Sequence, residues 1–218
     1  MNVNLILQDR FLEAFFTGLL GPSFYLTGGT ALARYYFYHR ESLDLDLFTH
    51  KQEQDFAQVN RVVLGILTNL GLQITSQAIT DTFIQYIVYD RENTILKIDL
   101  VKDVLIRFGE PIVRGSVRVD SLENIGSNKI LAVFGRTDAK DFIDLYWILQ
   151  RTDLKFDDLY RQALEKDLGL SGLYLAYALQ SVTKIHMFPR MLVPLPWEEI
   201  KDFYQVLAQD LLMKIRPE

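Results

Sequence analysis

The strongest constraint on the fold is a change in hydrophobic period near residue 121. Before it, short runs alternate apolar and polar residues with the period of two that is typical of strands. These runs are "SLDLDLF", "LQITSQA", "TFIQYIVYD" and "TILKIDLV", and the short apolar run "FYLTGG" precedes them. After it, "SLENIGSNKILAVFG" and "DAKDFIDLYWILQR" begin a series of segments with the 3.6-residue period of helices. The sequence therefore predicts an α+β fold, with a mixed β-sheet first and a helical part second.

Helices are also expected within the first part. Residues 4–20 and 53–70 place their apolar side chains at helical spacing, so these segments should flank the sheet. "TALARYYFYH" is expected to be a helix that begins at Thr30, and "YDREN" to be a hairpin turn. The predicted division is an α/β domain over residues 1–120 and a helical domain over residues 121–218.

Composition excludes several classes of protein. The chain has 218 residues, 49% of them hydrophobic, a net charge of −5 and no cysteine, which excludes disulfides and thiolate metal sites. It shows no signal peptide and no apolar run of about 18 residues, so we expect a cytoplasmic globular protein that does not span a membrane. The acidic balance disfavours broad coating of nucleic acid, but a local basic patch could still hold RNA. Residues 97–140 carry eight Lys or Arg against six Asp or Glu.

Two aspartates, Asp44 and Asp46, lie one residue apart in "SLDLDLF". Side chains two apart on a strand share a face, so Leu43, Leu45 and Leu47 should face the core and both aspartates the other side. Two carboxylates this close repel each other, and a divalent cation such as Mg²⁺ would relieve that repulsion. The alternative is a solvent-facing strand with two surface aspartates.

Two further stretches accompany this pair. Gly28 and Gly29 stand where a strand gives way to a helix, where close backbone approach and free N–H groups suit a phosphate, and Thr30 adds a hydroxyl. In "ILKIDLV" the alternation puts Lys97 and Asp99 on one face, where a third carboxylate would suit metal-dependent phosphoryl chemistry. The simpler readings are an ordinary turn and an exposed aspartate paired with Lys97.

Taken together, these motifs resemble a known family. "GGTALA" followed by "DLD" is similar to the Gly-Gly/Ser-Thr plus Asp-x-Asp signature of the DNA polymerase β-like nucleotidyltransferase superfamily. "YHRESLDLDLF" and "NKILAVFGRTDAKDFIDLYWIL" resemble motifs of the AbiEii/AbiGii-type toxin nucleotidyltransferases. The resemblance runs from about Phe24 to Leu149, roughly two thirds of the chain.

The resemblance implies a nucleotidyltransferase fold and an enzyme that depends on Mg²⁺, with Mn²⁺ as a substitute, and transfers an NMP group from an NTP to an acceptor. It implies that Asp44 and Asp46 bind the metal, with Asp99 at the position of the superfamily's third acid. It also implies roles around the nucleotide for Gly28, Gly29 and Thr30 at the triphosphate, Ser42 at the turn before the strand, Lys129 at a phosphate, and Asp141 as a base or an orienting acid. The helical domain would then contribute to the active-site cleft.

The residues of the helical motif leave other readings open. Asp138 is expected to cap a helix. Asp144 could be only an acid at a helix start or a partner of Lys140, and Lys129 could lie on a solvated face. His39 is expected at the surface, as are His50 and His186. In "RYYFYH" packing of the helix is favoured over stacking on a base.

The resemblance favours an RNA acceptor, with tRNA foremost, and a toxin-like role in a toxin–antitoxin or phage-defence system. The expected partners are an NTP, the RNA and a cognate antitoxin protein. The alternatives are transfer to a protein or small hydroxylated acceptor, or a catalytically silent module that binds NTP.

Overall fold

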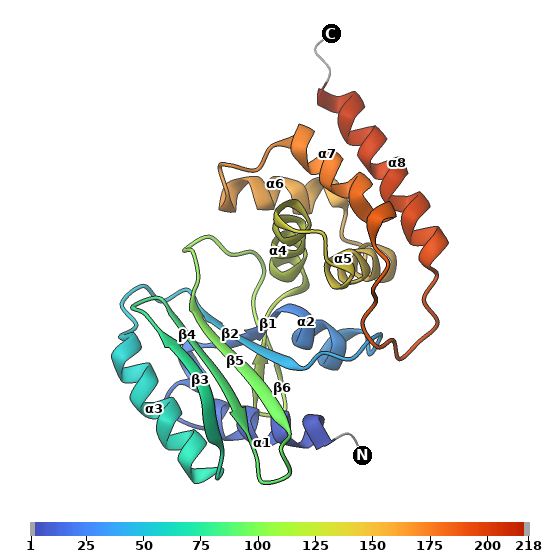
Figure 1. Ribbon diagram of the computed structural model, residues 1–218. Coiled ribbons are helices and arrows are strands. Elements are labelled where there is room, and N and C mark those ends of the chain that lie inside the picture. The colour runs from blue at the N-terminus through green and yellow to red at the C-terminus, as the bar shows by residue number, and fades with distance from the viewer. Residues whose placement is uncertain (1–2, 216–218) are drawn as a thin grey trace. The chain divides into compact units, whose positions relative to one another are not determined.

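The computed structural model describes residues 3–215, which separate into two compact units. The α/β unit comprises the chain up to Tyr36 together with Ser42–Ser121, and the helical unit comprises Phe37–Glu41 and the chain from Leu122 onward. The predicted α+β class, a mixed sheet with flanking helices followed by helices, is confirmed (Figure 1). The functional roles predicted for residues 1–120 and 121–218 stay predictions.

A seven-stranded mixed sheet forms the α/β unit, in the order β3-β4-β5-β2-β1-β7-β6. β2 pairs in parallel with β5, and β1 in parallel with β7, whereas the other neighbours are antiparallel. The strands are β1 (Tyr25–Thr27), β2 (Asp44–Thr49), β3 (Gln73–Ile79), β4 (Phe83–Tyr89), β5 (Ile95–Lys102), β6 (Ile112–Arg114) and β7 (Val117–Val119).

The five strands expected from the sequence, β1 to β5, are present, but β6 and β7 were not predicted. Each of these two strands has three residues, too few for an alternating pattern to stand out. They form a hairpin across Gly115, whose φ of +61° suits glycine. The hairpin extends the sheet beyond β1 through the β1–β7 pair.

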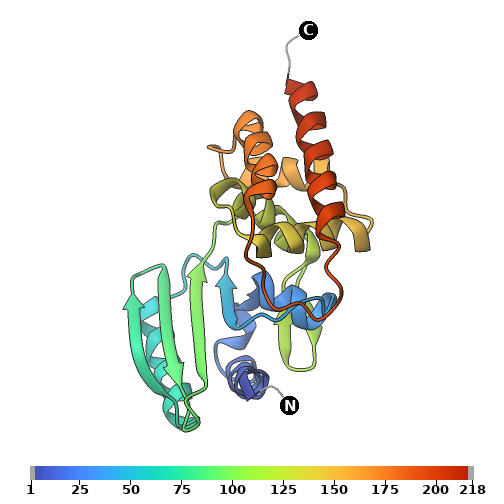
Figure 2. The same ribbon diagram turned by 45° about the vertical axis from the view of Figure 1, so that its right-hand side comes forward.

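Two helices, α1 (Val3–Phe16) and α3 (Phe56–Asn69), cover one face of the sheet (Figures 1 and 2). A chain of ring contacts joins them, from Phe15 of α1 through Phe24 to Phe56 of α3. On the same side, Tyr86 of β4 donates a hydrogen bond from its hydroxyl to Asn60 of α3. The core of the unit therefore lies on this face, and the opposite face is the open one.

The segment after β1 differs from its prediction. The helix α2 (Gly28–Ala31) begins at Gly28 with Thr27 as N-cap, two residues before the predicted start at Thr30. After Ala31 the chain continues as a π-helical turn, η2 (Leu32–Tyr36). The 3.6-residue period does not separate these two geometries, because a single π turn shifts the hydrogen-bond pattern by only one residue.

The helical unit contains α4 (Leu122–Gly135), α5 (Ala139–Arg151), α6 (Phe156–Lys166), α7 (Gly172–Gln180) and α8 (Trp197–Ile215). α7 and α8 lie side by side in both ribbon views (Figures 1 and 2), and the helix predicted in "LYLAYALQSVTKI" ends as the 3₁₀ turn η3 (Ser181–Lys184). In the α/β unit a further 3₁₀ turn, η1 (Gly21–Ser23), precedes β1.

The short segment Phe37–Glu41 packs within the helical unit although it comes early in the chain. The backbone N–H of Glu41 donates to the carbonyl of Arg190 at 2.8 Å, and that of Leu192 donates to the carbonyl of His39 at 2.9 Å. Two residues of the loop before α8 thus hold this segment.

Over residues 3–215, none of the helices has the length and apolar character that a membrane-spanning helix needs.

Candidate active site

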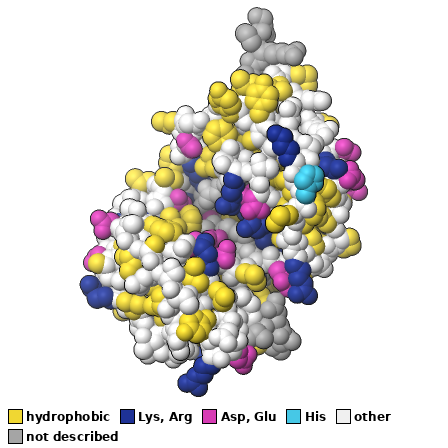
Figure 3. Space-filling view, in the orientation of Figure 1, with side chains coloured by type: hydrophobic (Ala, Val, Ile, Leu, Met, Phe, Trp, Pro, Cys, Tyr) yellow, Lys and Arg dark blue, Asp and Glu magenta, His cyan; other side chains and the backbone are white. Residues whose placement is uncertain are grey.

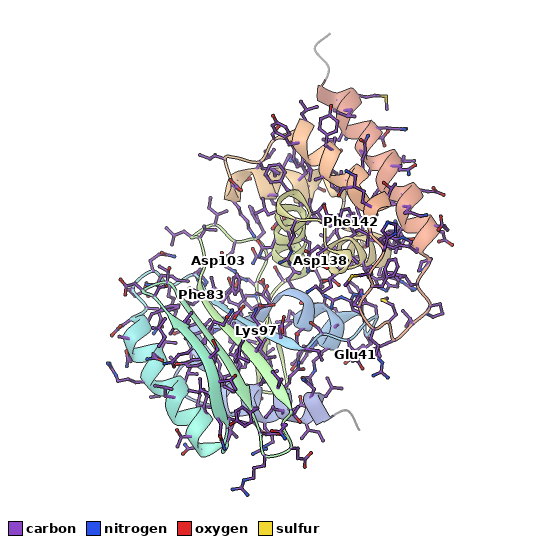
Figure 4. All side chains as sticks on the ribbon, in the orientation of Figure 1. Glu41, Phe83, Lys97, Asp103, Asp138 and Phe142 are labelled. Carbon is purple, nitrogen blue, oxygen red and sulfur yellow. The ribbon has the colours of Figure 1, made fainter. Side chains whose placement is uncertain are left out.

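The open face of the sheet carries the predicted acidic residues. In the β2–β5 register Asp44 lies opposite Lys97 and Asp46 opposite Asp99, and paired residues share a face. Leu45 and Leu47, which alternate with the aspartates, are fully buried on the other face. We call Asp44, Asp46, Lys97 and Asp99 the acid face; Figure 4 labels Lys97, and Figure 3 shows the unit's surface from the same side.

One neighbour of the acid face was misplaced. Leu43 was predicted to face the core but is 50% exposed, because β2 begins only at Asp44 and the strand alternation does not extend back to it.

Asp99 is held by two side chains of the sheet. Its Oδ2 accepts a hydrogen bond from Lys97 Nζ at 2.7 Å, and its Oδ1 accepts one from Gln85 Nε2 of β4 at 3.0 Å. The Asp99 side chain is only 14% exposed. The pairing with Lys97 that the sequence left open is therefore present, on a half-buried face.

The acid face also acts on Lys97. Burial alone would lower the pKa of the Lys97 ammonium, but the hydrogen bond to Asp99 and the charges of Asp99, Asp44 and Asp46 outweigh burial and raise it. Lys97 therefore stays charged and offsets part of the mutual repulsion of the three carboxylates.

Gly28 lies close to the Asp46 carboxylate of this face. It has a φ of +67°, and a Cβ added to it would lie 2.5 Å from Oδ2 of Asp46. Thr27, just before it, is the register partner of Asp46 on β1. Glycine suits this position for two reasons: it adopts the positive φ without strain, and it has no Cβ that would clash with the Asp46 carboxylate.

Thr30 and Ser42 connect α2 to the start of β2. The buried Thr30 hydroxyl donates to the backbone oxygen of Asp44 and lies 2.9 Å from Ser42 Oγ. Sequence reasoning missed Gln8 of α1, a buried residue whose Nε2 donates at 3.0 Å to the carbonyls of both Ser42 and Leu43. The backbone leading into Asp44 is thus fixed from two sides.

The acid face fits a divalent cation through two carboxylates rather than three. Over residues 3–215 no group of three or more His, Cys, Asp or Glu side chains is arranged to hold a metal ion. Asp44 and Asp46 nevertheless present adjacent carboxylates on one face, and Mg²⁺ is commonly bound by one or two carboxylates plus substrate phosphates. Because Gly28 has no Cβ, the Asp46 carboxylate can occupy its position beside Gly28.

A second cluster lies inside the helical unit and is centred on Asp144, which is fully buried. Arg40 donates to both of its oxygens, from Nε at 2.7 Å and from Nη2 at 2.6 Å. Nε2 of the buried His39 lies 2.8 Å from Oδ1, and Lys129 Nζ lies 2.7 Å from Oδ2. The bidentate arginine pair is the strong geometry for a buried carboxylate.

Lys129 bridges Asp144 to Asp141. Its Nζ donates to Oδ1 of Asp141 at 2.8 Å, and Oδ2 of Asp141 accepts from Arg136 Nε at 2.7 Å. Asp141 is fully buried and the Lys129 side chain is 9% exposed, whereas the Arg136 side chain is 60% exposed. The solvated position considered for Lys129 is wrong, because two buried carboxylates draw its ammonium inside.

These contacts set the charge states of the cluster. Burial would raise the pKa of Asp144, but the charges of Lys129 and Arg40 and the hydrogen bonds of His39 and Arg40 hold it well below its usual value. Burial would likewise raise the pKa of Asp141, but the charges and hydrogen bonds of Lys129 and Arg136 outweigh burial and lower it. The pKa of Lys129 is raised despite its burial, mainly by Asp144 and Asp141. Both acids and the lysine are therefore ionised at neutral pH.

Some expectations for this motif are corrected and others confirmed. His39 is not at the surface: it is fully buried, bonded to Asp144 and stacked on Trp147 at 5.4 Å between ring centroids. Asp138 does cap α5, accepting from Lys140 N at 3.0 Å, and it also pairs with Lys140. Asp144 is thus neither a helix-start acid nor a partner of Lys140; Figure 4 labels Asp138 on this helix.

Arg40 was missed as a site residue. It stands in "YHRESLDLDLF" just before the Asp pair, but a lone arginine in a loop carries no sequence signal for burial. The available signal was the spacing of Asp141 and Asp144, which share one side of α5 with apolar neighbours and so require cationic partners.

The predicted site residues fall into two groups. Gly28, Gly29, Thr30, Ser42, Asp44, Asp46 and Asp99 belong to the α/β unit, and Lys129 and Asp141 to the helical unit. Within each group the residues meet as described above. The convergence of both groups on one nucleotide stays a prediction.

Comparison with known proteins decides the family. The family described as the nucleotidyl transferase AbiEii toxin of type IV toxin–antitoxin systems matches residues 10–212. The chain belongs to the AbiEii nucleotidyltransferase toxin family. It is accordingly a nucleotidyltransferase, as the resemblance predicted.

Two solved structures share the fold of this chain. JHP933 from Helicobacter pylori is 21% identical, with a TM-score of 0.61 over 99% of this chain and 94% of that one. MenT4, a nucleotidyltransferase toxin from Mycobacterium tuberculosis, is 14% identical, with a TM-score of 0.62 over 99% of this chain and 93% of that one. These likenesses show the shared fold. No curated protein matches the sequence.

The close approach of Gly28 to Asp46 predicts a specific defect in this AbiEii enzyme. Gly28→Ala should displace the Asp46 carboxylate, because the new Cβ would stand 2.5 Å from Oδ2. Cation-dependent NTP binding, measured by calorimetry, should weaken by about tenfold or more.

Gly71→Ala is the matched control, since Gly71 has a φ of +70° with nothing within 4 Å of an added Cβ. Both variants should lose about 1 kcal/mol in the free energy of unfolding from the positive φ. Equal NTP binding by the two variants would show that Gly28 serves only the backbone turn.

The ion pairs of Asp144 predict a stability effect and its pH dependence. Asp144→Asn leaves buried cations without their counter-charge and should cost about 3–5 kcal/mol in unfolding free energy, measured in urea at pH 7. Because the folded-state pKa of Asp144 is depressed, its contribution is present above the usual aspartate pKa of about 4 and is lost as pH falls below it. The variant should therefore lose stability less steeply in acid than the wild type.

Asp157→Asn is the control for this prediction. Asp157 pairs with Lys214 at 2.6 Å, but both side chains are more than half exposed, so its loss should cost within about 1 kcal/mol. A cost for Asp144→Asn no larger than that of the control would contradict the role given to the buried cluster.

Proposed function

We propose that this enzyme transfers a nucleotidyl group from an NTP to an RNA acceptor, with tRNA foremost, in a reaction that depends on Mg²⁺. In this proposal it acts as the toxin of a toxin–antitoxin system and has a protein antitoxin as partner. Family membership supports the toxin role, because the family is described as a toxin of type IV systems. MenT4, which shares the fold, is likewise a nucleotidyltransferase toxin.

The observation that carries the proposal is the pair Asp44 and Asp46 on the open face of β2. The two carboxylates are adjacent, half-buried and backed by the fully buried Leu45 and Leu47, so the strand cannot turn them away from each other. Gly28, which leaves space for the Asp46 carboxylate, adds the glycine turn that nucleotide phosphates require for close approach.

The proposed reaction is a displacement at the α-phosphorus. The acceptor hydroxyl oxygen forms a bond to this phosphorus, the bond from the phosphorus to the oxygen bridging to the β-phosphate breaks, and pyrophosphate leaves. The hydroxyl proton passes to a base, which is water or a protein group. Asp44 and Asp46 would hold Mg²⁺, or Mn²⁺ in its place, which when bound neutralises charge that develops on the phosphate oxygens.

The chain's other predicted residues take supporting parts. Gly28, Gly29 and Thr30 would lie along the triphosphate, with Ser42 holding the turn that leads into Asp44. Lys129 would supply positive charge toward phosphate. Asp141 suits an orienting acid better than a base, because both of its oxygens accept hydrogen bonds from cations and its pKa is lowered.

An RNA acceptor is favoured by local charge rather than by the overall balance. The chain as a whole carries −5, yet residues 97–140 hold eight Lys or Arg against six Asp or Glu. RNA phosphates require cations at the surface, and Arg114 and Arg136 of this stretch are exposed.

The test is transfer of label from each of four α-labelled NTPs to total tRNA by the purified full chain. The expected result is Mg²⁺-dependent labelling that EDTA abolishes and that Asp44→Asn lowers by about 10²–10³-fold or more. The substitution retains shape and changes one half-exposed charge, so circular dichroism should show an intact fold.

Asp81→Asn provides the matched control, because Asp81 is an exposed aspartate in the turn between β3 and β4 and belongs to the same unit. It should label tRNA as the wild type does. Label that enters a protein or small acceptor instead of tRNA would favour that acceptor class. NTP binding that persists unchanged in EDTA, without transfer, would favour a silent binding module.

A further inference from the structure

A lysine lies among the three carboxylates of the acid face. β5 runs parallel to β2 in a register that puts Lys97 opposite Asp44 and Asp99 opposite Asp46. Lys97 and Asp99 are two apart on one strand, and Lys97 Nζ donates to Asp99 Oδ2 at 2.7 Å. An ammonium therefore already stands in the site where cations are attracted.

Asp99 is committed to this lysine and to one further partner. Its second oxygen, Oδ1, accepts a hydrogen bond at 3.0 Å from Gln85, its register partner on β4. A cation that used Asp99 as a ligand would have to replace at least one of these two contacts. Asp44 and Asp46 lie one strand away on β2, and Lys97 is the register partner of Asp44.

The net charge of the acid face also suits a single divalent cation. Three carboxylates and one ammonium leave two negative charges on the acid face, which one divalent cation balances. A second divalent cation would create an excess of positive charge beside Lys97, and like charges within a few ångströms repel.

We propose that Lys97 occupies Asp99 and thereby limits the acid face to one divalent cation, held by Asp44 and Asp46. The inference rests on the proposed function, because it concerns the cation of the same site. It assigns Lys97 as a positioning residue and takes Asp99 out of the metal-ligand set predicted from the sequence.

The experiment is a titration of the full chain with Mn²⁺, followed by electron paramagnetic resonance without nucleotide or acceptor. The wild type should bind one Mn²⁺, and Asp46→Asn should lose it. Lys97→Met should bind Mn²⁺ about tenfold more tightly or take up a second ion, because removal of a neighbouring positive charge shifts such equilibria by about one power of ten or more. Lys97→Arg, which preserves the charge, should behave as the wild type.

Lys102→Met is the matched control on the same strand. Lys102 lies on the opposite face of β5, where its Nζ donates to the carbonyl of Gln52 at 3.0 Å and lies 5.3 Å from the ring centroid of Phe56. This variant should bind Mn²⁺ as the wild type does. Lys97→Gln, a second neutral variant checked by circular dichroism, guards against a folding defect specific to methionine.

The double variant Lys97→Met, Asp99→Asn tests whether the increase in Mn²⁺ affinity or stoichiometry in Lys97→Met depends on the Asp99 carboxylate. If the double variant lacks the tighter Mn²⁺ binding or the second ion of Lys97→Met, the proposal is supported, because the Asp99 carboxylate freed in Lys97→Met is then what attracted the ion. An unchanged affinity and stoichiometry in Lys97→Met overturns the proposal but leaves the proposed function standing. A wild type that binds no Mn²⁺, or an Asp46→Asn variant that still binds it, also overturns the proposal, whereas the proposed function is tested separately by transfer of label from NTP to tRNA.

Discussion

The parallel pairing of β2 with β5 is the constraint on which the candidate site depends. Both strands alternate strictly, so the register that buries Leu45, Leu47, Ile98 and Leu100 also puts Asp44, Asp46, Lys97 and Asp99 on the other face. A slip of one residue would drive carboxylates into the core and leucines into solvent. The hydrophobic core therefore holds together three acids that would otherwise separate, and Lys97 offsets part of their repulsion.

The helical unit solves a different electrostatic problem. A buried carboxylate is stable only when the attraction of its partners repays its lost hydration. Asp144 meets this condition through Arg40, Lys129 and His39, and a cluster in which each acid is fully engaged is rigid rather than adaptable. Arg40 lies only four residues before Asp44, so the chain leaves this anchored cluster directly before the strand that carries the acids.

Sequence patterns predicted the fold well where a period extends over many residues. The alternation of β2, β4 and β5 and the helical period of α3 to α6 were sufficient, because burial of one face requires those periods. The hairpin of β6 and β7 was missed since three-residue strands show no period, and Leu43 was misplaced since periodicity does not say where a strand begins.

The residues of the candidate site were likewise predictable only where they follow from the period of a single element. Asp44, Asp46 and Asp99 were found because strand geometry makes i and i+2 neighbours, and the structure places all three on one face. The burial of His39 and Arg40 was not predictable, because both contact Asp144, about 100 residues further along the chain. Lys129 is buried against Asp141, 12 residues away on the next helix, and this contact also forms only in the folded unit. Sequence spacing describes one element at a time, and this cluster is made of three.

The two clusters carry opposite excess charge. The acid face has three carboxylates and one lysine, whereas the cluster of the helical unit has two carboxylates and three cations in Arg40, Lys129 and Arg136. A metal-bound nucleotide contains both signs, a divalent cation and a chain of phosphates. The excess on the acid face is the sign that attracts the cation, and the excess on the other cluster is the sign that attracts phosphate. In the proposed function, the residual charge of each cluster would act on the nucleotide, and the internal ion pairs of each cluster set how large that residual charge is.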